Sequence, residues 1–473
     1  TTCLVVGASS SGVFGVRRAP SSNTPLDSSP VTLGSSGAAP GGLAVGVRGR
    51  EFLVGWTSSL GIDLTRVADG ATSPLDTPPR RLDSGYTGTI TLAGDADGWT
   101  AAWSTAPTST STSYTTALRR LSPTLAPLGS GPVSAGVGSS LLRPPVARVG
   151  NAVGVASWAL RSGTTDYQLY FRRYDAATLA PLDASPQLVA GPAGSTYGGA
   201  PVVTPLTDRW LVGCAWSNAR VVTGGGSSLS TLRLTTFGSA VPASSLIDVG
   251  SAASRQYRPR IASDGTYALV VWEEQRDDGS AVFGARVRVS DGTLVDTAPV
   301  RVSPTSDQFA GCAAVTAGGG RFFVSWLTGT SDLLGCQYGR ARGLRLNPAN
   351  LAPVDAAPVS LMPTAFTTVG VSRDNAGFDG TFVVVVRGSD GHYLMRVRPT
   401  DGTVVSPAGE FFGSSTTWPD AEGLSLAQSM IEGGASPQVQ RIDRVHIVVA
   451  IEQQMLVACA TMAHHHRVAG RGA

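Results

Sequence analysis

Acidic and basic side chains gather in one short stretch of the sequence, where Glu273-Glu274 is followed by Arg276 and the pair Asp277-Asp278. Two carboxylates can hydrolyse a glycosidic bond by acid–base chemistry when they lie about 5 to 9.5 Å apart across it. Adjacent residues of a strand point to opposite faces of the sheet, so Glu273 and Glu274 do not readily form such a pair. We therefore expect this stretch to be a solvated loop that holds an internal salt bridge.

A second candidate site consists of aromatic residues that stand just ahead of recurring apolar segments. If these segments are the first strands of a repeat, the rings lie on one face and could stack on a sugar ring or a peptide. The alternative is that they pack between neighbouring repeats, where large aromatic areas contribute most. The residues are Tyr86, Tyr197, Tyr257, Phe309, Phe366 and Trp418.

Motifs for metals and nucleophiles are weak. The turn Asp95-Ala96-Asp97-Gly98 begins the alternating oxygen pattern of a calcium loop but lacks its closing acid. The preference of Asp-Gly for hairpin turns is enough to explain these sequences. We therefore expect no cofactor, and calcium is the alternative that such turns could bind. His464–His466 lie in the C-terminal tail, and no nucleophile motif accompanies His392 or His446.

The cysteines suggest a structural role. None of Cys3, Cys214, Cys312, Cys336 and Cys459 has the Cys-x-x-Cys spacing typical of zinc sites. Cys3 and Cys459 lie near opposite ends of the chain, and a closed ring would bring those ends together. A disulfide between them would suit an oxidising compartment, and two unrelated buried thiols are the alternative.

The elements that must position these residues form a repeat. A hydrophobic strand that ends in tryptophan recurs roughly every 50 to 60 residues, which indicates one supersecondary unit repeated along the chain. Each unit continues with a strand that carries arginine near its end and then, in several copies, a phrase such as Pro74-Leu75-Asp76. The tryptophan strands are Phe52–Trp56, Trp99–Trp103, Val153–Trp158, Trp210–Trp216, Tyr267–Trp272 and Phe322–Trp326, and Thr381–Val386 keeps the apolar run without the tryptophan.

Four strands per unit and eight copies of the arginine strand predict an all-β chain folded as a single β-propeller. We expect eight four-stranded blades over residues 1–462, with seven or nine blades as alternatives, and a flexible tail over 463–473. The chain opens with segments that resemble second and third strands, so the C-terminal region must supply the inner strand of a closing blade shared by both ends. We expect a short helix over Ala421–Ile431 and a strand over Val445–Ile451.

At the level of this repeat, the chain resembles the repeat-type β-propellers of secreted and surface proteins of bacteria. The matching phrase is Asp264-Gly265 through Trp272, then Gly284-Ala285-Arg286, then Asp291 to Asp296. The repeat pattern lacks the Gly-His and Trp-Asp marks of WD-type repeats and the Ser-x-Asp-x-Gly-x-Thr-Trp box of sialidase propellers. The resemblance implies the fold alone, because a propeller carries many functions.

Composition narrows the classes of function. The balance of Lys+Arg 36 against Asp+Glu 33 gives a net charge of +3, which is no electrostatic case for nucleic acid. No segment approaches the roughly 18 to 20 apolar residues of a membrane helix, so we expect no membrane span. There is no basic-plus-apolar leader either, and we expect a secretion signal to be absent or already removed.

We therefore expect a secreted or cell-surface module for binding or adhesion rather than an enzyme. A rigid ring would present variable loops, among them 159–166, 217–228 and 328–335, to a glycan or a protein ligand. One alternative is a structural subunit of a surface filament or layer, in which ring faces self-assemble head to tail. The other is a propeller polysaccharide hydrolase or lyase whose site lies at the central channel.

Overall fold

The structure is a computed structural model. It describes residues 3–9, 12–18, 27, 29–34, 41–58, 60–69, 71–106, 114–139, 144–160, 167–190, 195–196, 201–218, 230–238, 247–249, 255–276, 279–329, 339–361, 370–371, 376–378, 381–387, 391–405, 410–414, 424–428 and 447–451. These residues form strands and turns, and none of them lies in a helix. Within the described ranges, no helix has the length and apolar character to cross a membrane.

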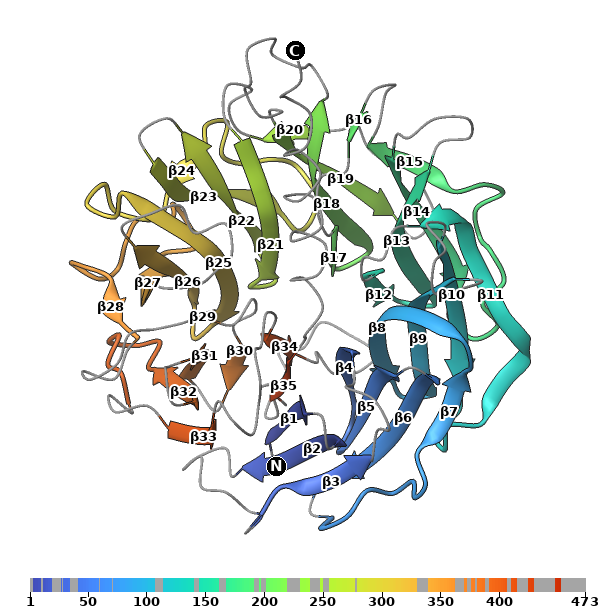
Figure 1. Ribbon diagram of the computed structural model, residues 1–473. Helices are drawn as coiled ribbons and strands as arrows, with labels where there is room; N and C mark the ends of the chain where they lie inside the picture. The colour runs from blue at the N-terminus through green and yellow to red at the C-terminus, as the bar shows by residue number, and fades with distance from the viewer. Residues whose placement is uncertain are drawn as a thin grey trace, which may run out of the picture.

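Antiparallel sheets follow one another around a central axis, which is the arrangement of a β-propeller (Figure 1). In one unit the chain runs outward from the axis through β21 (Arg255–Ser263), β22 (Tyr267–Arg276), β23 (Gly279–Arg288) and β24 (Val300–Arg301). The predicted strand Tyr267–Trp272 is confirmed as part of β22. The turn between β21 and β22 contains Gly265 at φ +90°, a backbone angle that glycine adopts without strain.

The other sheets repeat this plan. Three of them comprise β4 (Gly41–Arg48), β5 (Glu51–Ser58), β6 (Gly61–Ala68) and β7 (Arg80–Asp83); β8 (Tyr86–Asp95), β9 (Gly98–Ala106), β10 (Tyr114–Leu121) and β11 (Pro127–Ser139); and β12 (Val146–Val149), β13 (Ala152–Leu160), β14 (Tyr167–Asp175) and β15 (Gln187–Ala190).

Further round the ring lie β16 (Ser195–Thr196), β17 (Val202–Pro205), β18 (Arg209–Asn218), β19 (Ser230–Gly238) and β20 (Ile247–Val249); β25 (Phe309–Gly318), β26 (Arg321–Gly329), β27 (Arg340–Leu346) and β28 (Val359–Ser360); and β29 (Gly370–Val371), β30 (Ala376–Phe378), β31 (Thr381–Arg387), β32 (Gly391–Val397) and β33 (Glu410–Ser414). β23 and β25 touch through one parallel pairing, Ser280 with Phe309, which joins two units into an eight-stranded sheet.

Strands from both ends of the chain share one sheet, in the order β3–β2–β1–β35–β34. It contains β1 (Cys3–Ser9), β2 (Gly12–Arg18), β3 (Val31–Gly34), β34 (Leu424–Gln428) and β35 (Ile447–Ile451). β35 lies parallel to β1, and β34 pairs with β35 in the antiparallel sense. The predicted strand near Val445 is confirmed, whereas the predicted helix over Ala421–Ile431 is wrong, because pairing with β35 gives residues 424–428 the ladder hydrogen bonds of a strand. The predicted tail, 463–473, lies outside the described residues.

The tryptophans of the second strands form the centre of the sheets. Trp56, Trp103, Trp158, Trp272 and Trp326 are each exposed by 2% or less. Both faces of the inner strands are buried, because each sheet packs against its two neighbours, and apolar side chains therefore follow one another without alternation. The interpretation of these tryptophans as core residues is confirmed.

The two ends of the sheets differ in their connections. One end, which we call the turn face, carries tight turns such as 264–266 between β21 and β22. The other end, the loop face, carries the connections between second and third strands, which range from residues 59–60 in one sheet to 219–229 in another. The loops proposed for recognition lie on this face, and most of their residues (161–166, 219–228 and 330–335) lie outside the described ranges.

Candidate functional site

The arginines of the third strands and the aspartates of the Pro-Leu-Asp phrase form one repeated ion pair on the turn face. In each pair both the guanidinium and the backbone N–H of the arginine donate to the aspartate carboxylate. Both side chains are mostly or fully buried. The pairs are Arg17–Asp27, Arg66–Asp76, Arg173–Asp183, Arg286–Asp296 and Arg345–Asp355.

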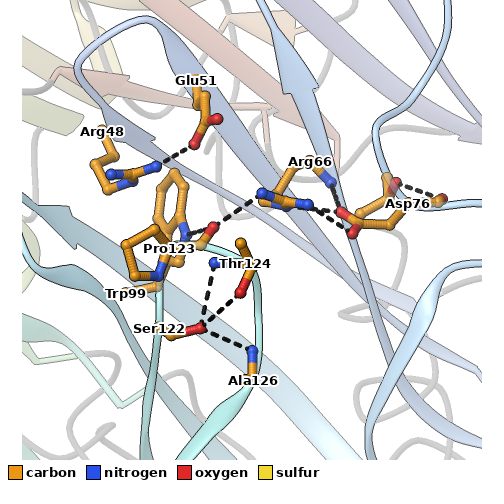
Figure 2. Close-up of polar contacts among 10 residues, drawn as sticks. Arg48, Glu51, Arg66, Asp76, Trp99, Ser122, Pro123, Thr124 and Ala126 are labelled. Atoms are coloured by element: carbon orange, nitrogen blue, oxygen red, sulfur yellow. Dashed lines mark hydrogen bonds and ion pairs between the residues drawn. The ribbon is translucent and has the colours of Figure 1, made fainter.

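Figure 2 shows how one such pair reaches the neighbouring sheet. Nε and Nη2 of Arg66 donate to Asp76 at 3.0 and 2.9 Å, and Nη1 donates to the carbonyl of Pro123 at 3.0 Å. The indole N–H of Trp99 shares that carbonyl at 3.5 Å. The hydrogen bond to Asp76 raises the pKa of Arg66, which keeps the guanidinium charged. We call this arrangement the inter-sheet clamp, and its repetition makes it a structural device rather than a ligand site.

The turn that begins a calcium-like pattern is occupied by arginines. Oδ2 of Asp95 accepts from Nη1 of Arg120 at 2.6 Å and from Nη1 of Arg148, in the next sheet, at 2.6 Å. Burial raises the pKa of Asp95, but the hydrogen bonds from both arginines outweigh it, and the pKa lies below its ordinary value. Two guanidinium groups beside one carboxylate disfavour a cation there. Within the described ranges, no group of three or more His, Cys, Asp or Glu could hold a metal ion.

Polar side chains are buried at the loop-face end of β21 and β22. Gln256, Glu273 and Glu274 are exposed by 0%, 2% and 1%. The predicted solvated loop is therefore wrong over residues 273–276, because β22 continues through Arg276 and both glutamates keep ladder partners in β21 and β23. Asp277 and Asp278 lie outside the described residues. The predicted internal salt bridge is present as Arg276–Glu274, whereas Glu273 pairs with Arg258, which lies outside the predicted stretch.

Glu273 faces the sheet that begins with β25. Its Oε2 accepts from Nη1 of Arg258 at 3.0 Å, and its Oε1 accepts from the backbone N–H of Cys312 at 2.6 Å. Both partners sit in β-bulges of inner strands, at φ +53° and +56°, where Gly42 occupies the corresponding bulge of β4 at +44°. A non-glycine residue in this region costs of order 1–3 kcal/mol, so the buried carboxylate holds together two strained positions.

Glu274 faces the opposite way, toward the sheet of β17–β20. Its Oε1 accepts from Nε of Arg276 at 2.8 Å, and its Oε2 accepts from Nε2 of Gln256 at 3.4 Å. The guanidinium of Arg276 lies 4.7 Å from the ring centre of Phe283, and the Arg276 side chain remains 47% exposed. One edge of this guanidinium is therefore held by a buried acid and one face by a ring, while the remainder meets solvent.

The predicted aromatic residues do not all lie at the same position of their strands. Phe309 opens β25, is half-buried, and pairs through its backbone with Ser280. Tyr86 opens β8 at the corresponding register, whereas Tyr257 lies further along β21, opposite Glu273, so these residues do not all occupy equivalent positions. The side chains of Tyr86 and Tyr257, and all of Tyr197, Phe366 and Trp418, lie outside the described residues.

A disulfide is formed by the residue whose backbone N–H donates to Glu273. Cys312 is disulfide-bonded, and its partner's side chain lies outside the described part of the chain. Cys214 is a buried thiol. Cys3 begins β1, but neither its side chain nor Cys459 is described, so the pairing of these two stays a prediction.

Sequence reasoning missed Gln256 and Arg258 as members of the cluster. The signal that could have found them is the repeat itself. The sheet of β25–β28 has Ala310 opposite Thr328 where this sheet has Gln256 opposite Glu274. We call Gln256, Arg258, Glu273, Glu274 and Arg276 the polar cluster.

Comparison with known proteins gives likenesses of fold only. No family model matches the sequence, and no curated protein matches it either. An ulvan lyase of polysaccharide lyase family 25 aligns with a TM-score of 0.45 and 10% identity over 80% of this chain and 97% of its own. An α-L-arabinofuranosidase from Lactobacillus brevis aligns with a TM-score of 0.32 and 13% identity over 57% of this chain and 88% of its own. A puromycin-hydrolyzing peptidase from Mycobacterium tuberculosis aligns with a TM-score of 0.42 and 14% identity over 82% of this chain and 55% of its own. With TM-scores below 0.5, these likenesses carry no argument about activity, and the chain is similar to them as a β-propeller alone.

Proposed function

We propose that this propeller binds a saccharide on its loop face, at the polar cluster, and that it serves as a binding module of an extracellular or cell-surface protein. The observation that supports the proposal is the departure of β21–β22 from the repeat. Burying polar groups costs free energy unless every one is hydrogen-bonded, and the sheet of β25–β28 has Ala310, Leu327 and Thr328 where this sheet has Gln256, Glu273 and Glu274. The neighbouring unit forms the same kind of sheet without these buried polar groups, and residues that break a repeat's own pattern are expected at functional sites.

The chemistry of the cluster suits a saccharide. Arg276 is the most exposed member of the cluster and its guanidinium donates to sugar oxygens, whereas the buried carboxylates of Glu273 and Glu274 hold Arg258 and Arg276 in place. Phe309 is half-buried beside Ser280 on the same face and offers an aromatic surface to a sugar ring. A few convergent polar groups beside aromatic side chains are typical of small-molecule sites.

The geometry favours binding over hydrolysis at this cluster. Glu273 and Glu274 face different sheets, and each is held by an arginine, so they do not flank one bond as a pair of catalytic carboxylates must. The names of the similar structures include a glycosidase and a lyase, which is nearer to the hydrolase or lyase alternative than to adhesion. That alternative would need carboxylates from other sheets.

Two finer features of the fold belong to the same proposal. We propose that the ring has eight blades; the eight-stranded sheet, which contains two repeats, and the sheet shared by both ends of the chain support this number. We also assign the protein to an oxidising compartment outside the cell, since a disulfide at Cys312 persists there and is rare in the cytosol.

The test is a glycan array followed by calorimetry of the best ligand. Arg276→Ala should weaken binding about tenfold or more, because a hydrogen bond to a charged group contributes about 1.5–3 kcal/mol. Arg288→Ala is the matched control: Arg288 lies in the same sheet on the turn face and its side chain is 48% exposed, against 47% for Arg276. Equal losses in the two variants, or no saccharide bound at all, would refute the proposal. Release of reducing or unsaturated sugar ends would favour the enzyme alternative, and ordered polymers in micrographs the structural one.

A further inference from the structure

Exposed apolar side chains recur at one position of the repeat. This position lies opposite the third-strand arginine, where the chain turns back toward the fourth strand; in one unit the backbone N–H of Leu75 donates to the carbonyl of Arg66 at 2.8 Å. Of the large apolar side chains exposed in the described part of the chain, all but Leu60 and Leu188 occupy it. We call these residues the apolar rim: Leu75, Leu128, Leu182, Val354 and Val405, exposed by 38% to 48%.

The inter-sheet clamp accounts for the aspartate of each phrase but not for the apolar residue before it. Asp76 is buried against Arg66, whereas the preceding Leu75 is 44% exposed. Single exposed leucines are normal on a protein surface. The same exposure at one position of successive units is not a random scatter, because a polar side chain there would avoid exposing apolar surface to water.

The segments that carry the rim present no charge to solvent. Apart from the clamp aspartates they contain no charged residue. Those carboxylates are at most 9% exposed, and each is neutralised by its arginine. The surface of these segments is therefore formed by Pro, Leu, Val, Ala, Gly, Ser and Thr. The segments are 74–79, 127–134, 181–186 and 353–358.

The rim lies at one height on the turn face. Connections between third and fourth strands leave the sheets at the same end as those between first and second strands, because neighbouring strands within each unit are antiparallel. Three of these connections, 69–79, 176–186 and 289–299, have the same length. Connections on the loop face instead range from residues 59–60 to 219–229. The turn face is therefore the level face of the ring, and the loop face is the variable one.

We infer that two copies of this chain pair through their turn faces, with the apolar rim of each in the contact. The rim recurs from unit to unit around the ring (Figure 1), so a partner contacts several of its residues at once only if that partner is level and repeats with the same spacing. A second copy meets both conditions, and a two-fold axis makes the contact self-complementary. The uncharged segments give the two copies no reason to repel each other.

The size of the surface suits a stable dimer. A standard interface takes about 20–30 residues from each partner, and the segments of the rim together supply a surface of that order. Apolar surface gathered beyond what a monomer normally exposes is typical of such interfaces. The inference goes beyond the proposed function and leaves it undisturbed, because the loop faces of the two copies point outward.

The experiment measures the mass of the full chain by sedimentation velocity at about 1–100 μM, a range that covers the weakest interfaces of standard size. We expect a dimer. Leu182→Glu should weaken association at least about tenfold, because a carboxylate in an apolar contact is desolvated without a partner. Leu188→Glu is the matched control. Leu188 is 48% exposed, as Leu182 is, but lies opposite Tyr170 in β15, nearer the loop face, and its variant should associate like the parent.

A charge-swap pair separates loss of the contact from loss of the fold. Leu75→Glu/Leu182→Glu/Val354→Glu and the same triple change to arginine should each be monomeric alone. Mixed together they should form a dimer again, because opposite charges then meet across the contact. A monomeric parent, equal weakening in the Leu182 and Leu188 variants, or indefinite polymers would overturn the inference. So would a monomer whose rim binds phosphatidylcholine vesicles, and each of these results leaves saccharide binding at the loop face untouched.

Discussion

The inter-sheet clamp at Arg66 makes a quantitative prediction for Asp76→Ala. The aspartate carboxylate accepts from the backbone N–H, Nε and Nη2 of Arg66 at 2.9, 3.0 and 2.9 Å, and the two side chains are 13% and 3% exposed. Removing one partner of a buried ion pair costs about 3–5 kcal/mol, since the other charge is left uncompensated. Arg66 keeps its hydrogen bond to the carbonyl of Pro123 and some contact with water. We therefore expect the free energy of unfolding to fall by about 3 kcal/mol.

The assay is chemical denaturation followed by tryptophan fluorescence, with two companion variants. In Arg66→Met/Asp76→Ala the buried charge is gone and only the backbone N–H of residue 66 lacks its acceptor, so the loss should fall to about 1–3 kcal/mol. Arg288→Ala breaks an exposed pair with Asp291 on the same face and should leave the free energy unchanged within error. A loss below about 1 kcal/mol for the single variant, or a double variant less stable than the single one, would refute the clamp as a stabilising device.

Two further predictions concern single contacts. The pKa of Asp95 is lowered, so its carboxylate stabilises the fold above its ordinary pKa of 3.8, and this contribution is lost as the pH falls below that value. Asp95→Asn should therefore flatten the acid limb of a plot of melting temperature against pH. An unchanged acid limb would contradict this. Trp326→Phe removes the indole donor to buried Asp307 and should cost more stability than Trp272→Phe, whose indole has no partner among the described residues; equal losses in thermal unfolding would show that indole hydrogen bonding does not distinguish the two sites.

The repeat made the fold predictable, and its regularity also set the limit of what the sequence could reveal. Strands such as β22 were located because apolar runs and Asp-Gly turns are local signals. The end of β22 was misjudged because a run of charged residues is typical of a loop, and only the ladder with β21 and β23 overrides that local signal. The strand at Leu424–Gln428 was also missed, because it is defined by its pairing with β35, which is remote in sequence.

The clamp shows a different limit. Both halves, the arginine near the end of the third strand and the aspartate ten residues later, are visible in the sequence. The contact between the two residues is not visible there, because a third-strand arginine could equally face solvent or a ligand. The contact appears only when the connection to the fourth strand folds back and places Asp76 or Asp296 against the backbone N–H of its arginine.

The unit of β21–β24, together with the adjacent strand β25, gathers features that work against stability. Arg258 and Cys312 hold strained backbone angles, Glu273 and Glu274 bury charge, and the indole of Trp272 lacks an acceptor among the described residues. Natural proteins tolerate such features where function requires them. The neighbouring unit has Ala310 and Thr328 where this unit has Gln256 and Glu274.

Replacement of the polar cluster by its neighbour's residues separates function from stability. Gln256→Ala/Glu274→Thr installs the residues that the next unit has at these positions. Replacing buried ionic groups by residues that fit is often neutral or stabilising, so the variant should unfold at the same urea concentration as the parent or above it. It should also lose saccharide binding, because Arg276 is no longer held by Glu274. A variant that unfolds earlier and still binds would mean that the polar cluster supports the scaffold and that the ligand site lies elsewhere on the loop face.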